Sequence, residues 1–323
     1  MKKLIVILLV IIIAGGGFYI AMTNNPSVEQ FIEEQFIGPD GKITTFIQKE
    51  EYLTESNGLY MQYLLLTDNE QAFREQAELI EAKSEAGYLP WRDGEAHSNA
   101  SVDDLRIMKS LYAGADKWDD DYEKVAQDIQ SFIKEHQVKE GLIVDFYDEK
   151  SEAASGEVHL SYIDAEALDH FSSDVKEAHA ALLESVEGEE FFPEVYDVGA
   201  EAFSYQDEVN MIDQSLIALN SSLLGIRPQE FLAFVEEEME EEGRIYGRYE
   251  RDTKEAAETY ESPSAYAILI LTYLENGERE VAEVLYERMK ELQTEEGGYK
   301  SDSEDAHFFD NVLPAIAEEE FSE

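Results

Sequence analysis

Apolar residues recur at three- and four-residue intervals through most of the chain, and no long segment alternates in the manner of a half-buried strand. The segments with helical spacing are 72–83, 102–115, 122–136, 207–224, 229–241, 262–275 and 278–292. Each is closed by Gly, Pro, Asp or Asn, residues that commonly end helices. This spacing places apolar side chains on one face of an α-helix. The pattern therefore predicts an all-α protein from about residue 28 onward.

A second regularity is a glycine that is followed closely by aliphatic or aromatic residues. It occurs at Gly41, Gly87, Gly141, Gly188, Gly243 and Gly298, at intervals of 46, 54, 47, 55 and 55 residues. A period near 50 residues, made of two helices and a short extended link, is typical of arrays of helical hairpins. Six units without a polar capping repeat predict a closed (α/α)6 toroid. We expect each glycine at a helix C-cap, where a left-handed backbone favours Gly.

The N-terminal segment has the composition of an export signal. Lys2 and Lys3 precede an unbroken apolar run from Leu4 to Ile13, and small residues follow at 14–17. A cleaved signal peptide and an uncleaved membrane anchor both fit this pattern. Either would place the rest of the chain outside the cytoplasm. We therefore expect a signal or anchor over 1–24 and one (α/α)6 domain over 25–323, secreted or attached to the cell membrane through its N-terminal helix.

The charge and cysteine content exclude several classes of function. The chain has 73 Asp and Glu against 24 Lys and Arg, a formal net charge of −49, and it has no cysteine. A surface this acidic repels phosphate backbones and anionic headgroups, which argues against nucleic-acid binding and against membrane contact beyond the N-terminal segment. Without cysteine there can be no disulfide, thiol nucleophile or lipid-modified cysteine. The six histidines lack metal-ligand spacing, so we expect neither a metal nor an organic cofactor.

Three acidic positions stand apart from the general excess because each lies at a predicted unit boundary or helix start. They are Glu55, the pair Asp103 and Asp104, and the pair Asp207 and Glu208. An acid at a helix start is ordinarily a cap or a partner of the helix dipole. Their shared place in the repeat instead indicates a groove of carboxylates and aromatics at one mouth of the ring. Such a groove suits carbohydrate, although the aromatics could equally plug the end of the barrel.

Around these residues the sequence resembles glycoside hydrolase family 8, the (α/α)6 enzymes that cut β-1,4-linked glucan, xylan or chitosan. Segment 54–61, TESNGLYM, resembles the family's acid motif S/T-E-G-x-G/S-Y-G-M. Segment 87–92, GYLPWR, resembles its G-L-x-A-W-R, and segment 100–107, ASVDDLRI, its A-S/T-D-A/G-D-x-x-I. Segments 160–164 and 205–207 are similar to its P/L-S-Y-x-x-P/D stretch and to the Y-D-A-x-R region that carries the base. The resemblance covers about residues 28 to 320.

The resemblance implies an inverting reaction with two carboxyl groups, one protonating the leaving oxygen and one activating water. Glu55 would be the acid and Asp207 the base, with Asp213 as the alternative base; Asp103 or Asp104 would hold the sugar beside the cut. The candidate substrate-binding residues are Trp91, Arg92, Tyr60, Tyr147, Tyr162 and Tyr246. Two departures count against a standard cellulase, because Val102 replaces the family's first signature Asp and Asn210 replaces the Arg beside its base.

These observations predict a monomeric, extracytoplasmic glycosidase of the inverting endo-β-1,4-glycanase type that acts on an extracellular polysaccharide. The negative field favours a neutral or partly deacetylated glycan over a uronic-acid polymer. The alternative is a catalytically degenerate member that binds exopolysaccharide or assists its secretion, which the changes at Val102 and Asn210 favour. A third possibility, an α/α-toroid lyase, is disfavoured because few basic residues are present to neutralise a uronate.

Overall fold

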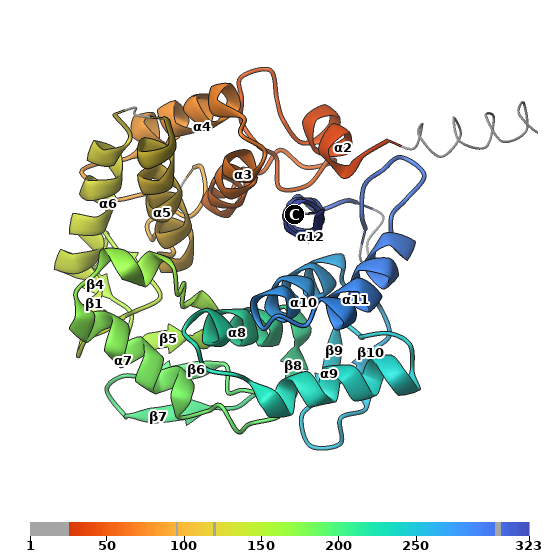
Figure 1. The fold of residues 1–323 in the computed structure, drawn as a ribbon. Helices are drawn as coiled ribbons and strands as arrows, with labels where there is room; N and C mark the ends of the chain where they lie inside the picture. Colours follow the sequence, from red (N-terminus) through yellow and green to blue (C-terminus); the bar gives the residue numbers. More distant parts are fainter. Residues whose placement is uncertain (1–25, 95, 119–120, 301–304, 323) are drawn as a thin grey trace, which may run out of the picture.

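Two concentric rings of helices surround one axis (Figure 1). The computed structural model describes residues 26–94, 96–118, 121–300 and 305–322. The inner ring contains α3 (Thr54–Leu66), α5 (Ser101–Trp118), α8 (Met211–Leu223), α10 (Pro263–Glu275) and α12 (Phe309–Ser322). The outer ring contains α2 (Val28–Gln35), α4 (Glu70–Lys83), α6 (Glu123–His136), α7 (Ser173–Glu184), α9 (Gln229–Glu241) and α11 (Arg279–Glu291). Because the chain alternates between outer and inner positions, the predicted (α/α)6 toroid is confirmed.

The distribution of apolar residues explains which helices lie inside. In α10, every residue from Pro263 to Ile270 is buried, as suits a helix packed on all sides. In the outer helix α6, burial is restricted to Ala126, Ile129 and Ile133, which form a single stripe. The start of α10 is also set locally, since the Ser262 hydroxyl accepts a hydrogen bond from the Ala265 amide and Pro263 occupies the first turn.

One inner position is occupied by irregular backbone instead of a full helix. Between α6 and α7 the chain forms two short 3-10 turns, η1 (Leu160–Tyr162) and η2 (Ala167–His170). The first packs against α8 and the second against α5, so this segment closes the inner ring between those helices. The segment is irregular where a helix was expected from the repeat.

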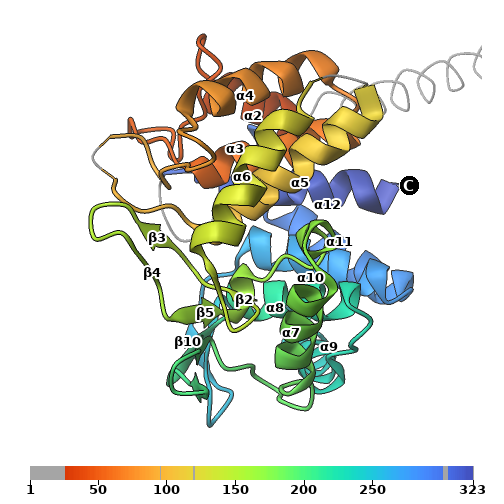
Figure 2. The ribbon, with the colours of Figure 1, turned by 90° about the vertical axis from the view of Figure 1, so that its left-hand side faces the viewer.

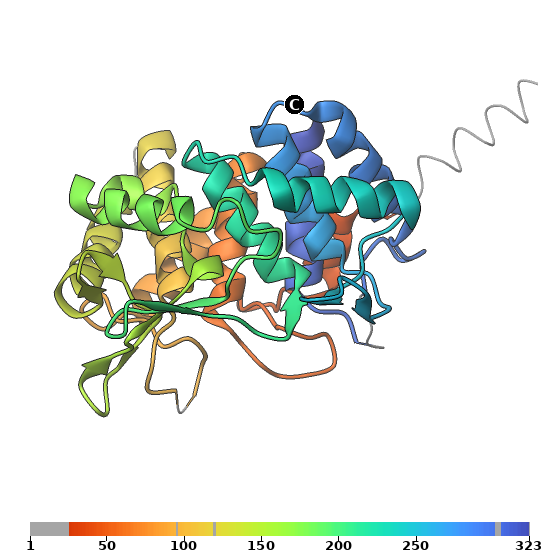
Figure 3. The ribbon, with the colours of Figure 1, turned by 90° about the horizontal axis from the view of Figure 1, so that it is seen from below.

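Short antiparallel strands gather at one end of the helical rings (Figures 2 and 3). Four of them form two hairpins: β1 (Val138–Lys139) pairs with β2 (Leu142–Ile143), and β3 (Tyr147–Asp148) pairs with β4 (Ala153–Ala154). The others form two three-stranded sheets, β5 (Glu157–His159), β6 (Val195–Asp197) and β7 (Ala202–Ser204) in that order, and β8 (Glu208–Asn210), β9 (Arg248–Glu250) and β10 (Ala256–Glu258) with β9 in the centre.

The repeated glycines mostly serve tight turns and not helix caps. The C-cap prediction is confirmed at Gly243, which directly follows the cap of α9 with φ +67°. Gly41, Gly87 and Gly141 also have positive φ, but they lie several residues beyond the preceding outer helix, in the turns of short hairpins. At Gly87 a Cβ atom would approach the Asp128 carbonyl oxygen to 2.1 Å, so this turn packs directly on α6. The prediction is wrong at Gly188 and Gly298; beside the latter, Gly297 has the positive φ instead.

The expected signal or anchor over 1–24 lies outside the described residues. Within the part of the chain that the structure describes, no helix is long and apolar enough to cross a membrane.

Candidate active site

A cavity of about 390 Å³ lies on the axis of the barrel, at the end where the inner helices begin. Glu55 from the first turn of α3, Asp103 from that of α5 and Asp213 from that of α8 all line it. Because α3 and α8 lie on opposite sides of the ring (Figure 1), Glu55 and Asp213 face the cavity from opposite walls. The inner helices direct their positive dipole ends toward these carboxyl groups. The fold thus gathers three acids, far apart in sequence, around one cavity.

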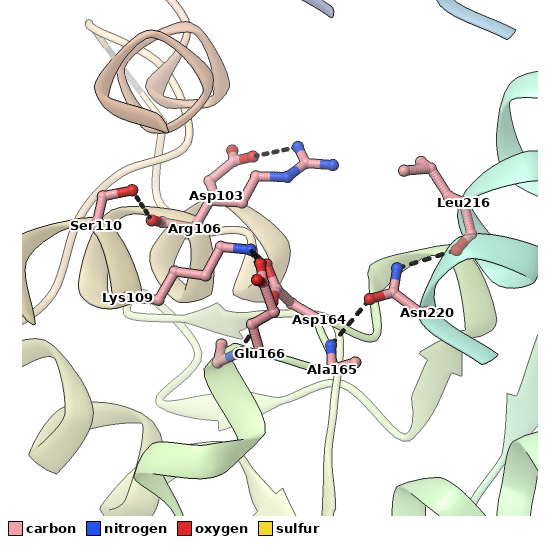
Figure 4. Close-up of polar contacts among 10 residues, drawn as sticks. Asp103, Arg106, Lys109, Ser110, Asp164, Ala165, Glu166, Leu216 and Asn220 are labelled. Carbon is pink, nitrogen blue, oxygen red and sulfur yellow. Dashed lines mark hydrogen bonds and ion pairs between the residues drawn. The ribbon is translucent and has the colours of Figure 1, made fainter. Parts of the chain in front are cut away.

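Arg106 connects two of these acids. Its Nη1 atom is 3.5 Å from Glu55 Oε1 and 4.0 Å from Asp103 Oδ1 (the latter pair drawn in Figure 4). Glu55 remains 29% exposed at the side chain, whereas Asp103 is 5% exposed. Burial, followed by the charge of Glu55, raises the pKa of Asp103 to about 8. Near neutral pH the Asp103 side chain therefore holds a proton.

Asp213 occupies a different environment on the opposite wall. Burial raises its pKa, while a hydrogen bond from Ser161 and the charges of His159 and Arg248 act in the opposite direction. Arg248 is the cross-strand partner of Asn210 in the β8–β9 register. Asn210 is the N-cap of α8, where its side-chain oxygen accepts a hydrogen bond from the Ile212 amide. Arg248 thus brings a positive charge near Asp213 from the strand that pairs with β8.

A buried aspartate orients the histidine near Asp213. Asp145 accepts hydrogen bonds from the His159 amide and from His159 Nδ1, both at 2.7 Å. The hydrogen bond to Asp145 is the main cause of a raised pKa at His159. The imidazole stacks on Tyr162, with ring centroids 5.1 Å apart. Burial, together with the charges of Asp145, Asp103, Asp213 and Glu55, raises the pKa of Tyr162 to about 12, which places this phenol among all four carboxyl groups.

Among the predicted substrate-binding residues, Trp91 and Tyr162 line the cavity. Arg92 is exposed and lies over the Trp91 ring, with its guanidinium carbon 4.8 Å from the ring centroid. The other three predicted residues pack elsewhere: Tyr60 is 4% exposed in the core beside Tyr63 and Phe308, Tyr147 packs on Phe132 and His136, and Tyr246 packs on Tyr249.

The predicted acids also divide between the cavity and other places. Asp207 and Glu208 are exposed; Asp207 lies in a bend before β8, where its carbonyl accepts a hydrogen bond from the Arg251 amide. Both were expected at a helix start, but α8 begins only at Met211. Asp104 is fully buried and accepts a hydrogen bond of 2.5 Å from Asn99 Nδ2. Asn99 in turn binds Gln137 Oε1 and the Tyr147 amide, so Asp104 holds α5 to the hairpin region.

Several lining residues were not identified from the sequence. Arg106 could have been found, because it lies three residues after Asp103 on the same helix and therefore on the same side. His307 and Phe309 also line the cavity, but they come from the last inner helix and the turn before it. No local pattern marks them. Val102 lines the cavity as well, so an apolar side chain occupies the place of the family's signature Asp.

Gly58 has a structural role at the contact between two inner helices. A Cβ atom there would lie 3.0 Å from Arg106 Cβ, so the residue permits α3 and α5 to pack closely. The described residues contain no group of three or more His, Asp or Glu side chains arranged to hold a metal ion.

Comparison with known proteins identifies the family of this chain. No protein-family model matches it. It is 33% identical over 311 residues to "Putative lipoprotein YdaJ" of Bacillus subtilis (strain 168), a match that covers 90% of this chain and 85% of the relative. The chain belongs to the YdaJ family.

Solved structures identify the fold of this family. PssZ from Listeria monocytogenes is 29% identical, with a TM-score of 0.81 over 91% of this chain and 94% of PssZ. A novel alpha-amylase from Clostridium perfringens is 21% identical, with a TM-score of 0.83 over 91% and 97%. Endoglucanase Cel10 from Klebsiella pneumoniae, a family 8 glycosyl hydrolase, is 16% identical, with a TM-score of 0.65 over 91% and 99%. The resemblance to glycoside hydrolase family 8 is thereby confirmed at the level of the fold, for a distant member.

Proposed function

We propose that this member of the YdaJ family is an inverting glycosidase that hydrolyses an extracellular polysaccharide. The observation that carries the proposal is that Glu55 and Asp213 face one cavity from opposite walls, with Asp103 beside Glu55. Inversion needs an acid on the leaving oxygen and a base that activates water across the sugar ring. Glu55, partly exposed at the start of α3, is the acid; Asp213, hydrogen-bonded by Ser161 and close to two cations, is the base.

The choice of Asp213 over Asp207 follows from position. Asp207 is exposed outside the cavity, whereas Asp213 lies in the first helical turn, as Glu55 and Asp103 do in theirs. Trp91 and Tyr162 offer the sugar-stacking surfaces, and Asp103 is the group that holds the sugar next to the cut. These roles need no cofactor.

We propose a β-linked, neutral or partly deacetylated substrate. The resemblance to glycoside hydrolase family 8 supports the β-linkage, and the net charge of −49 disfavours polyanions. Because another similar structure is described as an alpha-amylase, an α-1,4-glucan belongs in the same test. We also propose that the protein acts as a monomer outside the cytoplasm. The name of the relative supports membrane attachment, but this chain has no cysteine to carry a lipid, so its apolar N-terminal segment is the proposed anchor.

The test measures reducing-end release by residues 25–323 from chitosan, mixed-linkage glucan, xylan, poly-N-acetylglucosamine and amylose. We expect Glu55→Gln and Asp213→Asn to lose at least about 10²-fold in turnover, since each removes a proton-transfer group. The matched controls are Glu208→Gln and Asp207→Asn, which make the same chemical changes at exposed acids outside the cavity. Their turnover is expected to equal that of the unaltered protein. Loss in Asp207→Asn with activity kept in Asp213→Asn would overturn the assignment of the base.

A binding function without catalysis is the second candidate, because Val102 presents an apolar side chain to the cavity where the resembling family has a carboxylate. In that case no polysaccharide in the panel releases reducing ends, while at least one retards the protein in affinity electrophoresis. Alanine at Trp91 would then abolish the retardation.

A further inference from the structure

A second and larger cavity, of about 650 Å³, lies farther along the same axis. Its lining comes from residues later in the inner helices than those at the catalytic cavity: Leu65 and Leu66 in α3, Leu219 and Leu223 in α8, and Leu271 and Leu274 in α10. Val102, Arg106, Ser161 and Leu216 line both cavities and therefore lie between them. The volume falls within the range of small-molecule sites in proteins.

The two sides of this axial cavity differ in chemistry. The six leucines named above are partly exposed, although they lie on inner helices that are otherwise packed closely. Opposite them, α5 and the 3-10 segment contribute Arg106, Lys109, Asp164 and Glu166 (Figure 4). Lys109 is already paired with Asp164 at 2.9 Å and with Glu166 at 2.7 Å. A concave apolar surface that faces charged groups is an arrangement suited to an amphiphilic ligand.

Two polar groups of the lining lack hydrogen-bond acceptors among the described residues. They are Arg106 Nη1, in a residue that is 7% exposed, and the buried Gln62 Nε2. The carboxylate oxygens nearest to Arg106 Nη1, at 3.5 and 4.0 Å, are too distant or poorly aligned for hydrogen bonds. Buried donors without partners are unfavourable, and a ligand oxygen would relieve that cost.

The acidic residues of the axial cavity select against anions. Glu166, Glu275 and Glu320 line it, and the whole chain has a net charge of −49. An approaching carboxylate or sulfate is repelled by this field.

We propose that the axial cavity is a binding site for a neutral single-chain amphiphile with an oxygen-rich head, such as a monoacylglycerol. The head oxygens accept hydrogen bonds from Arg106 and Gln62, and the hydrocarbon chain lies along the six leucines. The site adjoins the proposed sugar cleft at Arg106, and binding there does not depend on glycosidase activity.

The test is isothermal titration of the protein with monodecanoyl glycerol below its aggregation concentration. We expect saturable binding of one molecule per chain. Ala113→Trp in α5 and Leu223→Trp in α8 each narrow the cavity. Each is expected to weaken binding by roughly tenfold, because about two methylene groups of the ligand would lose contact with the leucines. Either variant suffices if the other does not fold. Gln62→Leu, which removes a donor, is expected to weaken binding several-fold.

Matched controls separate this site from other surfaces. Val284→Trp makes a similar change on the outer helix α11, at a residue that is 51% exposed and lines neither cavity, and Trp91→Ala alters only the sugar cleft. Both are expected to keep the affinity of the unaltered protein. The proposal is overturned if no saturable binding occurs, if Ala113→Trp and Leu223→Trp both bind normally, if Trp91→Ala abolishes binding, or if decanoate binds as tightly as monodecanoyl glycerol.

Discussion

The three carboxyl groups that line the catalytic cavity have different neighbours and a different exposure to water. Glu55 keeps solvent contact and an arginine at 3.5 Å, Asp103 is buried beside Glu55, and Asp213 combines burial with a hydrogen bond from Ser161. Burial disfavours the charged form of an acid, while cations and donors favour it. Burial therefore favours the protonated forms of Asp103 and Asp213.

Asp103 makes the stability of the protein depend on pH in a defined direction. Its pKa rises from 3.8 to about 8 on folding, so between these values the native state binds more protons than the unfolded state. Stability therefore falls as pH increases through this window, by up to about 1.4 kcal/mol per pH unit from this one group. We expect Asp103→Asn to flatten the dependence, which urea unfolding at pH 5, 6, 7 and 8 measures.

The control for this prediction is Asp207→Asn, since Asp207 is exposed and outside the cavity. Its unfolding free energies are expected to run parallel to those of the unaltered protein. If the Asp103→Asn values also run parallel, Asp103 is ionised in the native state throughout the range and the proton assignment is wrong.

At the scale of elements, the irregular segment of η1 and η2 determines the shape of both cavities. It supplies Ser161 and Tyr162 to the catalytic cavity, and Asp164 and Glu166 to the axial one. The segment is attached to α5 through Lys109, which binds both acids (Figure 4). Burial alone would raise the pKa of Asp164, but Lys109 outweighs it and the pKa is lowered.

Removing this attachment is expected to destabilise the fold. Lys109→Met leaves Asp164, whose side chain is 9% exposed, without its cation. Loss of one partner from a buried ion pair lowers the free energy of unfolding by about 3 kcal/mol. The control is Lys176→Met, which breaks an ion pair between Lys176 and Asp169 whose side chains are 41% and 64% exposed. That pair ties the same segment to α7 at the surface, and its loss is expected to cost at most about 1 kcal/mol. Chemical denaturation compares the two; equal losses would contradict the anchoring role of Lys109.

At the scale of the whole molecule, closure of the ring concentrates a large excess of negative charge on one compact body. The C-terminal helix α12 packs against α3 and α10, so the first and last parts of the described chain meet (Figure 1). With a net charge of −49, the folded state is subject to self-repulsion, which opposes compactness.

Salt is therefore expected to stabilise the protein. Raising NaCl from about 0.01 M to about 1 M shortens the Debye length from roughly 30 Å to 3 Å and screens this repulsion. We expect the midpoint of thermal unfolding at pH 7.5 to increase by a few °C, about 1–2 kcal/mol for a domain of this size. Calorimetry with sucrose at equal osmolality controls for solvent exclusion. An unchanged midpoint in NaCl would show that the acidic groups are too far apart to repel one another appreciably.

The fold class and part of the site could be predicted from the amino-acid sequence alone. The spacing of apolar residues marks the helices, the period of about 50 residues indicates six hairpins, and both signals are local or repeat regularly. Glu55, Trp91, Asp103 and Tyr162 could be chosen because each lies in a short motif whose side chains reach the same mouth of the ring.

Which residues from distant parts of the chain also line the catalytic cavity depends on the tertiary structure. The helix expected over 207–224 begins at Met211, because β8 occupies the residues before it; Asp213, not Asp207, therefore lies in the first helical turn facing the cavity. Tyr60 and Asp104 are buried in the core and do not line the cavity. His307 and Phe309 line it because closure of the ring sets the C-terminal part of the chain beside α3. The spacing of apolar residues predicts which segments are helical. The direction of each side chain depends in addition on the residue at which the helix begins and on the elements that pack against it.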